Sequence, residues 1–578
     1  MRPLFRQFPL FRASARRFLS DSAKNKGAGA GSAPDWTTQL ARNRGKVLFG
    51  IGAVGSVAVY ETSDPVHEFV NHVYFTTERV GVVAQATIRC FYHYKKALGK
   101  QYQDEKERFE ALGRCHKQCA EITLHALSTN GGIFIKFGQH IGAMTYLLPP
   151  EWTETMVPLQ DRCPESTLED IDEMFVQDTG RSLEEQFTDI DPRPIGVASL
   201  AQVYTARLRS TGQKVAVKCQ HPELKEFVPV DVVLTQTVFA LMDRVFPEYP
   251  LTWLGDELQS SIYTELDFTK EAENARNTQE YFRDYSRVTA LRVPNVVLAL
   301  PRILVMEYVA GERLDNLEYI DSHGISRADV SACLSHIFNN MIFTPDVGLH
   351  CDPHGGNLAI RAVTPTAQNP HNFEIVLFDH GLYRFPETQL RRDYAHFWLA
   401  LLDRDRAGMQ YYAERFANVT PEQFPLFAAA ITGRSIDVAL NYDIASARSD
   451  AEIRDMTDRF VNGEFLPDLM AILSRIPRVV LLILKTNDLT RHLDETLRSP
   501  LGPARTFLIM TQYAARTVYW EAAEEADKRH RRWSVWWLAA RVCCWLRYER
   551  RLNQLYLYDA VLWCKQLWRG IEAAGATL

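Results

Sequence analysis

One short polar stretch, HCDPHGGN at residues 350–357, constrains this chain more than any other part of it. Within it Asp352 and Asn357 lie five residues apart, and Asp379 follows in LFDHG at 377–381, after a run with the composition of a strand. This layout is typical of a phosphoryl-transfer site. Asp352 would orient or deprotonate the attacking group, while Asn357 and Asp379 would hold Mg²⁺ on nucleotide phosphates. The first motif alone could be a chance polar loop, but the strand and Asp-x-Gly that follow it argue against chance.

The composition narrows the class of protein. The chain has 578 residues, of which 46% are hydrophobic and 24% charged, as expected for about two to four globular domains. Its net charge of −6 implies no basic face, so we expect no nucleic acid among its partners. The ten cysteines are scattered and form neither a zinc pattern nor a disulfide framework.

The N-terminus has the composition of a mitochondrial transit peptide, which we assign to residues 1–22. Residues 1–20 contain five arginines and no acidic residue, with phenylalanines between them. Losing these arginines would change the formal net charge from −6 to −11. A disordered basic tail is the alternative interpretation. Residues 23–46 are predicted to be a linker.

Residues 47–62 are predicted to be a transmembrane segment. The uncharged run 47–60 is 14 residues long, shorter than the ~20 residues that a spanning helix normally needs. Arginines and a lysine precede it and acids follow it, so the N-terminus would stay in the matrix and the rest of the chain would face the intermembrane space. A buried core helix is the alternative.

Residues 70–190 are predicted to form a helical N-terminal extension. Apolar residues recur at three-and-four spacing over 76–98 and 106–129, as on one face of a helix. The motif KFGQ, from Lys136 to Gln139, lies inside this region. By itself it could be a surface lysine before a turn.

The pattern changes to strands from Pro194. A β-run, a turn at 210–213 and the run KVAVK, ending at Lys218, predict a hairpin. Lys218 resembles the kinase lysine that contacts the α/β-phosphates, although a surface lysine at a strand end is the alternative. The loop GVAS at 196–199 stands where a glycine-rich phosphate loop would be. Alanine restricts the positive-φ conformations open to glycine, so this loop should be stiffer.

Two further segments complete the predicted nucleotide site. In ELDFTKEAEN at 265–274, Asp267 and Glu271 would share one helix face at i, i+4, where like charges are mildly destabilising. We therefore expect a cation or metal beside them, and a solvated acidic face is the alternative. The strand 301–307 ends at Glu307 and Tyr308 and could serve as the hinge that holds adenine.

The chain after Asp379 is predicted to be helical to its end. The predicted helices cover 390–402, 421–440, 466–485 and 504–527, and no A-P-E motif closes an activation segment. In the basic tail, 528–578, the aromatic residues Trp533, Trp536 and Trp537 would share a helix face with Ala540 and Cys544. This face could touch a membrane interface or pack on the preceding lobe.

Together these motifs resemble the UbiB family of aarF-domain atypical kinases, over about residues 133–384, and most closely its mitochondrial subgroup. The resemblance implies an α+β, bilobal kinase-like fold with a helical N-terminal extension and an all-helical C-terminal region. The N-lobe would cover 191–310, and the C-lobe with its helical region 311–527. ATP and Mg²⁺ would be the cofactors.

The resemblance also implies residue roles. The predicted catalytic residues are Asp352, Lys218 and Lys136; the predicted nucleotide contacts are Val197, Ala198, Ser199, Lys218, Glu271, Glu307 and Tyr308; the predicted metal ligands are Asn357 and Asp379; and the predicted regulatory residues are Gln139, Glu265 and Asp267. The extension would fold over the cleft and block a protein substrate, with Lys136 and Gln139 meeting Glu265 and Asp267. The implied activity is ATP hydrolysis or phosphoryl transfer to a lipid or quinone-like molecule at the mitochondrial inner membrane, in support of lipid or coenzyme Q homeostasis.

Three departures separate this chain from the family and from protein kinases. Val197 replaces an alanine of the family loop, His380 replaces the usual phenylalanine of Asp-Phe-Gly, and His354 stands where protein kinases have a lysine. The last departure weakens the case for protein phosphorylation. A non-catalytic nucleotide-gated scaffold and a small-molecule phosphotransferase stay open, although the latter class lacks K-x-G-Q and E-x-D.

Overall fold

The computed structural model describes residues 64–143, 148–161, 165–247, 252–351, 355–441, 472, 475–499 and 502–575. Its contacts divide the chain into two units, Met1–Thr77 and Glu78–Leu578, and the features below belong to the second, apart from residues 64–77 of the first helix. The predicted transit peptide, linker and segment 47–62 lie outside the described residues. Within the described ranges, no helix combines the length and the apolar character needed to cross a membrane.

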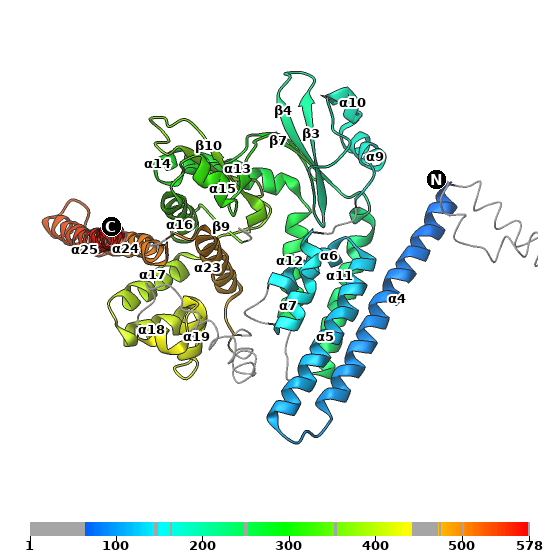
Figure 1. Cartoon of the computed structure of the whole chain (residues 1–578), viewed down its shortest axis with the longest axis horizontal. Coiled ribbons are helices and arrows are strands. Elements are labelled where there is room, and N and C mark those ends of the chain that lie inside the picture. The colour runs from blue at the N-terminus through cyan, green and yellow to red at the C-terminus, as the bar shows by residue number, and fades with distance from the viewer. Residues whose placement is uncertain are drawn as a thin grey trace, which may run out of the picture. The chain divides into compact units, whose positions relative to one another are not determined.

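Helices form the predicted N-terminal extension (Figure 1). They are α4 (Asp64–Leu98), α5 (Glu105–Asn130), α6 (Ile133–Ala143), α7 (Pro150–Met156) and α8 (Pro158–Asp161). Tyr94 joins three of them, because its hydroxyl lies 2.7 Å from His116 Nδ1 and accepts a 2.9 Å hydrogen bond from Trp152 Nε1. Gly131 and Gly132, with φ of 66° and 55°, turn the chain from α5 into α6, and this turn places the KFGQ motif at the start of a helix.

An antiparallel sheet follows, in the order β1-β3-β4-β7-β6, with β2 paired to β3. Its strands are β1 (Phe187–Thr188), β2 (Gly196–Val197), β3 (Ala201–Leu208), β4 (Lys214–Gln220), β6 (Val296–Leu300) and β7 (Ile303–Glu307). The predicted hairpin is confirmed, and Gly212 adopts φ 70° in its turn. α9 (Leu168–Thr179) and α10 (Leu183–Gln186) precede the sheet, and Ile171 and Phe175 of α9 share a buried core with Val217 and Ile303.

Helices α11 (Leu224–Val245), α12 (Thr252–Glu265) and α13 (Phe268–Arg283) connect β4 to the rest of the sheet. α11 begins at Leu224, so Pro229 lies within it. The predicted single acidic helix is wrong. Glu265 ends α12, and Asp267 has an extended backbone and caps α13 by accepting a 3.1 Å hydrogen bond from Thr269 N.

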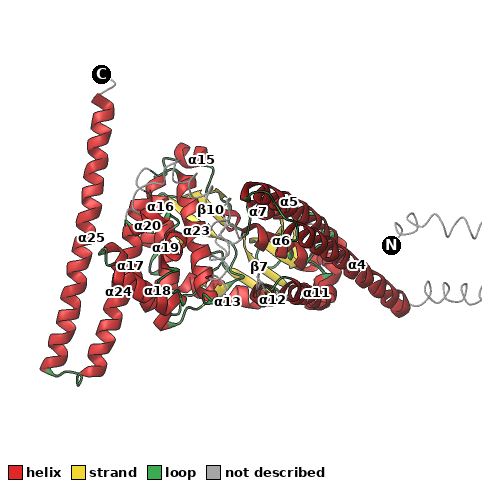
Figure 2. Cartoon of the chain, turned by 90° about the horizontal axis from the view of Figure 1, so that it is seen from below, coloured by secondary structure: helices red, strands yellow, loops and turns green. Residues whose placement is uncertain are grey.

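The second lobe is mainly helical (Figure 2). Its helices are α14 (Ser286–Thr289), α15 (Leu317–Ser322), α16 (Arg327–Phe343), α17 (Thr388–Leu402), α18 (Arg406–Ala417), α19 (Phe424–Thr432), α20 (Ile436–Leu440), α23 (Arg478–Leu497) and α24 (Gly502–Arg529). A small sheet runs in the order β5 (Leu291–Arg292), β11 (Phe373–Leu377), β10 (Leu358–Ala362), β8 (Glu312–Arg313). A strand-rich lobe and a helical lobe confirm the predicted α+β, kinase-like fold.

Two expectations for the C-terminal half are corrected. A short strand, β12 (Tyr383–Arg384), follows Asp379 and pairs with β9 (Leu349–His350), so the chain is not helical throughout after Asp379. The tail forms α25 (Val535–Gly575), but Trp533 lies before it with φ 67° and so cannot share the helical face of Trp536.

Candidate active site

Lys218 is the centre of the candidate site. It lies in β4, and its Nζ is 2.7 Å from Glu271 Oε1 on α13 and 3.8 Å from Asp379 Oδ1. Burial opposes the charge on Lys218, but the carboxylates of Asp379 and Glu271 outweigh it and raise its pKa. Burial also raises the pKa of Glu271 to about 7, against the attraction of Lys218. The predicted Lys218–Glu271 contact is therefore present, with the lysine charged.

One face of α13 connects this lysine to the Asp-His-Gly loop. Glu271, Asn274 and Thr278 recur at three-and-four spacing and so lie on the same side of the helix. Asn274 Nδ2 donates a 2.9 Å hydrogen bond to His380 O, and the Thr278 hydroxyl donates a 3.2 Å bond to the Tyr383 hydroxyl. The sequence reading missed Asn274, Thr278 and Tyr383 as supports of the site, although the periodicity from Glu271 could have pointed to the first two.

The strand pair β9–β12 brings the two motif loops together. His350 Nε2 lies 2.9 Å from the carbonyl oxygen of Asp379, so the chain entering 350–357 is fixed to the Asp-His-Gly loop. Burial lowers the pKa of His380 to about 3, which keeps it neutral, and its Nδ1 lies 3.0 Å from the Tyr383 hydroxyl. Position 380 therefore carries a buried, neutral, hydrogen-bonded ring.

The predicted metal ligands lie side by side. Asn357 Nδ2 is 3.4 Å from Asp379 Oδ2, and Gly381 N donates a 2.8 Å hydrogen bond to Asp379 Oδ1. Burial opposes ionisation of Asp379, but the positive charge of Lys218 outweighs it and holds the pKa well below its usual range. An ionised carboxylate, 35% exposed, beside an amide fits Mg²⁺, a hard ion that prefers oxygen ligands. Asp352 and His354 lie outside the described residues, so the role of Asp352 stays a prediction.

The extension reaches this cluster through α6. Lys136 Nζ lies 2.8 Å from Glu265 Oε2, with side chains 15% and 13% exposed, and the charge of Lys136 also helps to lower the pKa of Asp379. The predicted contact with Glu265 is therefore present, whereas the described contacts of Asp267 are those of a helix cap. Gly138 is explained by packing, because a Cβ there would lie 2.1 Å from Leu159 Cδ1.

Gly381 marks where the acidic groups converge. A Cβ on this residue would lie 3.2 Å from Asp379 Oδ1, 3.8 Å from Glu265 Cγ and 4.0 Å from Glu271 Oε2. Glycine therefore makes room for three carboxylates from three different segments. The two lysines, 136 and 218, come from two more segments and balance part of this negative charge.

The predicted phosphate loop is a tight turn between β2 and β3. Val197 ends β2, and Ala198 N donates a 2.8 Å hydrogen bond to Ala201 O. Ser199 is buried, and its hydroxyl lies 3.5 Å from Gln139 Oε1, so the extension touches this loop too. His221, which the sequence reading missed, places its Nε2 3.0 Å from Ala198 O. Contacts on both sides thus hold the turn.

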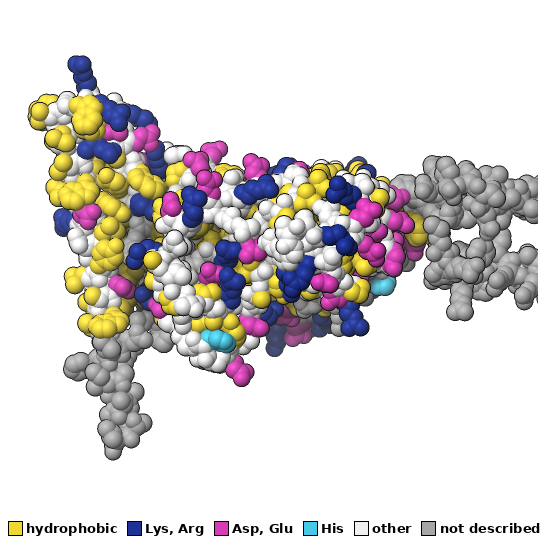
Figure 3. Space-filling view, turned by 90° about the horizontal axis from the view of Figure 1, so that it is seen from above, with side chains coloured by type: hydrophobic (Ala, Val, Ile, Leu, Met, Phe, Trp, Pro, Cys, Tyr) yellow, Lys and Arg dark blue, Asp and Glu magenta, His cyan; other side chains and the backbone are white. Residues whose placement is uncertain are grey.

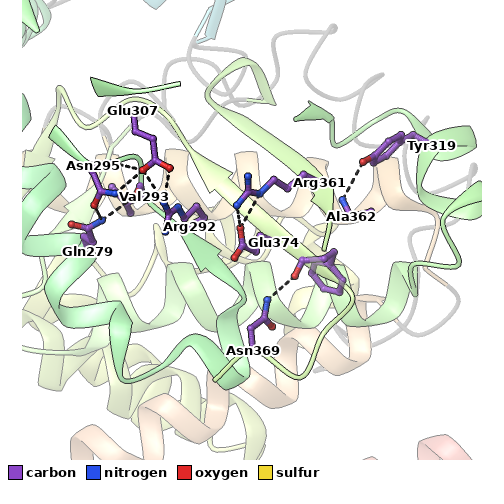
Figure 4. A network of polar contacts seen from close by, with 11 residues as sticks. Gln279, Arg292, Val293, Asn295, Glu307, Tyr319, Arg361, Ala362, Asn369 and Glu374 are labelled. Atoms are coloured by element: carbon purple, nitrogen blue, oxygen red, sulfur yellow. Dashed lines mark hydrogen bonds and ion pairs between the residues drawn. The ribbon is translucent and has the colours of Figure 1, made fainter. Parts of the chain in front are cut away.

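The predicted adenine hinge is held by polar contacts shown in Figure 4. Arg292 Nη2 donates 2.7 Å bonds to both carboxylate oxygens of Glu307, and Asn295 Nδ2 donates a 2.6 Å bond to Oε2. The backbone N–H groups of Glu307 and Tyr308 donate to Asn295 O and Lys214 O. Because these donors are already bonded, an adenine at this edge would have to be recognised by other backbone groups.

Comparisons with known proteins agree with this geometry. The family model described as "ABC1 atypical kinase-like domain" matches residues 158–413. "ABC1 family protein MCP2" of Saccharomyces cerevisiae is 64% identical over 91% of this chain and 93% of its own length. A homologue of that name in Schizosaccharomyces pombe is 47% identical over 78% of this chain and 80% of its own. "AarF domain-containing protein kinase 1" of Mus musculus is 32% identical over 82% and 91%.

Proposed function

The chain belongs to the ABC1 family of atypical kinase-like proteins, and from that premise we propose that it binds ATP with Mg²⁺ and hydrolyses or transfers the terminal phosphoryl group. The observation that carries the proposal is the convergence of Lys218, Glu271 and Asp379, with Asn357 beside Asp379. A charged lysine anchored by a buried glutamate, next to an ionised aspartate, is what a phosphate and metal site requires.

The surroundings of each site residue suggest its role in the proposed reaction. Lys218 would contact the α/β-phosphates, with Glu271 fixing the direction of its ammonium group. Asn357 and Asp379 would hold Mg²⁺, and Asp352 would orient the acceptor. When bound, Mg²⁺·ATP supplies the transferable phosphoryl group and a positive charge that offsets charge developing on the phosphate oxygens.

The Lys136–Glu265 contact favours an acceptor smaller than a folded protein. It places a helix of the extension beside the metal residues, because Lys136 is close enough to influence the ionisation of Asp379. A protein substrate would have to displace this helix. We therefore propose a lipid or quinone-like acceptor, or water, rather than a protein side chain.

The proposed location is the mitochondrial inner membrane, with a role in lipid or coenzyme Q homeostasis. The support is in the sequence: the arginine-rich, acid-free residues 1–20 and the uncharged run 47–60. On this proposal the kinase-like part faces the intermembrane space, because the basic flank of the run precedes it.

The decisive experiment is Asp379→Asn, measured as the thermal shift induced by Mg²⁺·ATP and as the rate of phosphate release. A ligand at 100 times its Kd stabilises the folded state by about 2.7 kcal/mol, and the variant should lose most of this shift. Asp321→Asn is the matched control. Asp321 is an exposed residue of α15, and it forms an ion pair with Arg327 at the start of α16. An unchanged shift in Asp379→Asn would disprove the metal assignment. A normal wild-type shift without turnover, tested with lipid and quinone additives, would favour the nucleotide-gated scaffold.

A further inference from the structure

Helix α25 has one face fixed against the rest of the chain. Leu555 is fully buried, and the ring of Tyr548 stacks on Tyr519 of α24 with centroids 4.9 Å apart. Trp537 Nε1 donates a 2.7 Å hydrogen bond to Asp527, and Arg551 donates 2.6 Å bonds to Asp403. These contacts are spread along the helix and fix its rotation about its own axis. They therefore determine which residues point outward.

The outward face is apolar along most of the helix, as Figure 3 shows. Its members recur at helical spacing and are between 45% and 67% exposed: Leu538, Val542, Trp545, Leu546, Leu557 and Trp563. Single exposed apolar residues are ordinary, but a continuous stripe of large ones marks an interaction surface. The described part of the chain leaves this face uncovered.

The charge around this face identifies the covering material. Residues 528–564 contain eight lysines and arginines and two acidic residues, so their formal charge is +6 in a chain whose total is −6. Five of the arginines are exposed and make no ion pair with any described residue: Arg529, Arg531, Arg532, Arg547 and Arg550. Arg547 and Arg550 flank the outward face along the helix, and the other three lie before its first turn. The surface is thus apolar in the middle and positive at its border.

We propose that α25 lies on the surface of an anionic lipid bilayer, with its outward face among the acyl chains and its arginines at the lipid phosphates. Tryptophan, leucine and arginine in this arrangement are typical of helices that lie in the membrane interface. Arginine reaches the phosphates while its methylene groups stay on apolar surface. A second copy of the chain suits the face less well, because two copies would bring the same excess of positive charge together. The proposal is independent of the nucleotide site.

The native thiol of Cys564 reports on this face in the full chain. Cys564 is exposed, and its helical position places it on the same side of α25 as Leu546 and Leu557. A water-soluble maleimide should modify it about ten-fold more slowly with phosphatidylcholine vesicles that contain phosphatidylglycerol than with phosphatidylcholine alone, because an interfacial helix buries its apolar face in the headgroup region. Peptide mass spectrometry measures this thiol by itself, so membrane insertion of another segment does not enter the result. A cysteine introduced by Val233→Cys, exposed on α11, should be modified at equal rates with both vesicles.

Two variants separate the apolar and the electrostatic contributions. Trp545→Glu with Leu546→Glu should restore fast modification with anionic vesicles, whereas Val233→Glu with Leu241→Glu, an equal change on α11, should not. Arg547→Gln with Arg550→Gln should restore it in part. Equal modification rates of the wild-type chain with both vesicles would overturn the proposal. So would protection that appears without lipid and rises with protein concentration, which would identify a second copy as the occupant.

Discussion

The cleft, meaning here the cluster of Lys136, Lys218, Glu265, Glu271 and Asp379, differs from the helical core of the second lobe in how it holds basic side chains. In the cleft, Lys218 and Lys136 each contact a glutamate from another segment, at 2.7 and 2.8 Å. In the second lobe, between α16 and α24, the half-buried His336 has Arg505 and Arg516 as its charged neighbours. Burial, with these arginines, lowers the pKa of His336 to about 4, so the ring stays neutral.

The second lobe fixes its helices with hydrogen bonds that involve no carboxylate. The Tyr513 hydroxyl lies 2.9 Å from His336 Nδ1 and accepts a 2.7 Å bond from Asn340 Nδ2. Arg516 Nη2 donates to Asn340 Oδ1 and Thr344 Oγ1, at 3.2 and 2.8 Å. These bonds join α16 to α24 without a carboxylate, whereas a glutamate holds each lysine of the cleft. The comparison shows two ways of holding a basic side chain inside this fold: by a carboxylate, as for Lys218, or by amide and hydroxyl oxygens, as for Arg516.

The largest effect should follow from breaking the central ion pair of the cleft with Lys218→Met. The variant keeps the length of the side chain but removes the charge that faces the phosphates, so turnover should fall by about 10²–10³-fold. Stability should fall by less than the 3–5 kcal/mol typical of a broken buried pair, because Glu271, with a pKa near 7, can take up a proton.

Phosphate release and chemical unfolding measure the two effects of Lys218→Met separately. Lys225→Met is the control, since Lys225 is an exposed lysine on α11. Turnover in Lys218→Met within a few-fold of wild type would show that the charge is structural only.

The neutral ring of His336 gives a pH prediction with a fixed sign. Between pH 6.5 and 4 the unfolded chain protonates His336 while the folded chain does not, so the free energy of unfolding falls as the pH falls. At 1.36 kcal/mol per pKa unit the contribution reaches about 3 kcal/mol at pH 4. His336→Asn removes the titrating group and should flatten the pH dependence by that amount.

Chemical unfolding from pH 7 to pH 4 checks this prediction. The exposed His492 on α23 provides the matched substitution, and His492→Asn should keep the pH response of the parent. Parallel curves for wild type and His336→Asn would mean that His336 is protonated within the folded chain, and the contrast between the two regions would fail.

The contacts between site residues could be predicted from the sequence better than the secondary structure around them could. The spacing of Asp352, Asn357 and Asp379 is fixed by phosphate chemistry, so the motif could be recognised without coordinates. The helix break between Glu265 and Asp267 could not, because the choice between continuing and capping depends on Gln220, whose amide donates to Leu266 O at 2.7 Å. A pattern of charges does not encode that tertiary contact.

The supports of the site also escape sequence reasoning. β9 and β12 have two residues each, too short for any alternation to appear, and their pairing joins positions 350 and 383. His221 and Tyr383 look like ordinary residues until the loops they hold are in place. Conversely, the basic, tryptophan-rich tail left packing and membrane contact equally open; α25 packs one face on α24 and leaves another apolar face exposed.

A smaller effect is expected from the second ion pair of the cleft. Lys136→Ala leaves Glu265 without its 2.8 Å partner, but both side chains are partly exposed, so the cost in stability should be about 1–3 kcal/mol. Loosening α6 should open the cleft, and self-phosphorylation should appear or rise. Ala198→Gly should act in the same direction by freeing the phosphate loop.

Phosphate incorporation into the purified chain measures this gating. Lys117→Ala is the control, because Lys117 is on the same extension but bonds to Thr155. Lys136→Ala combined with Asp352→Asn should lose the gained signal. Flat incorporation in Lys136→Ala, or a signal that survives loss of Asp352, would show that Lys136 does not gate a kinase-like site.

The smallest effect should come from the contact between Gln139 and the phosphate loop. Gln139 Oε1 and the Ser199 hydroxyl are 3.5 Å apart, at the limit of a hydrogen bond, whereas Gln139 Nε2 donates a 3.0 Å bond to Leu159 O within the extension. Gln139→Ala should therefore destabilise the chain by about 1 kcal/mol, chiefly through the bond to Leu159. In a double-mutant cycle with Ser199→Ala, the coupling energy should be below about 0.5 kcal/mol both for unfolding and for Mg²⁺·ATP binding. A coupling energy well above this value for Mg²⁺·ATP binding, but not for unfolding, would mean that the extension contacts the phosphate loop more strongly when nucleotide is present. Lys136 would then share its control of the cleft with Gln139, and the two pairs of the cleft would act as one unit.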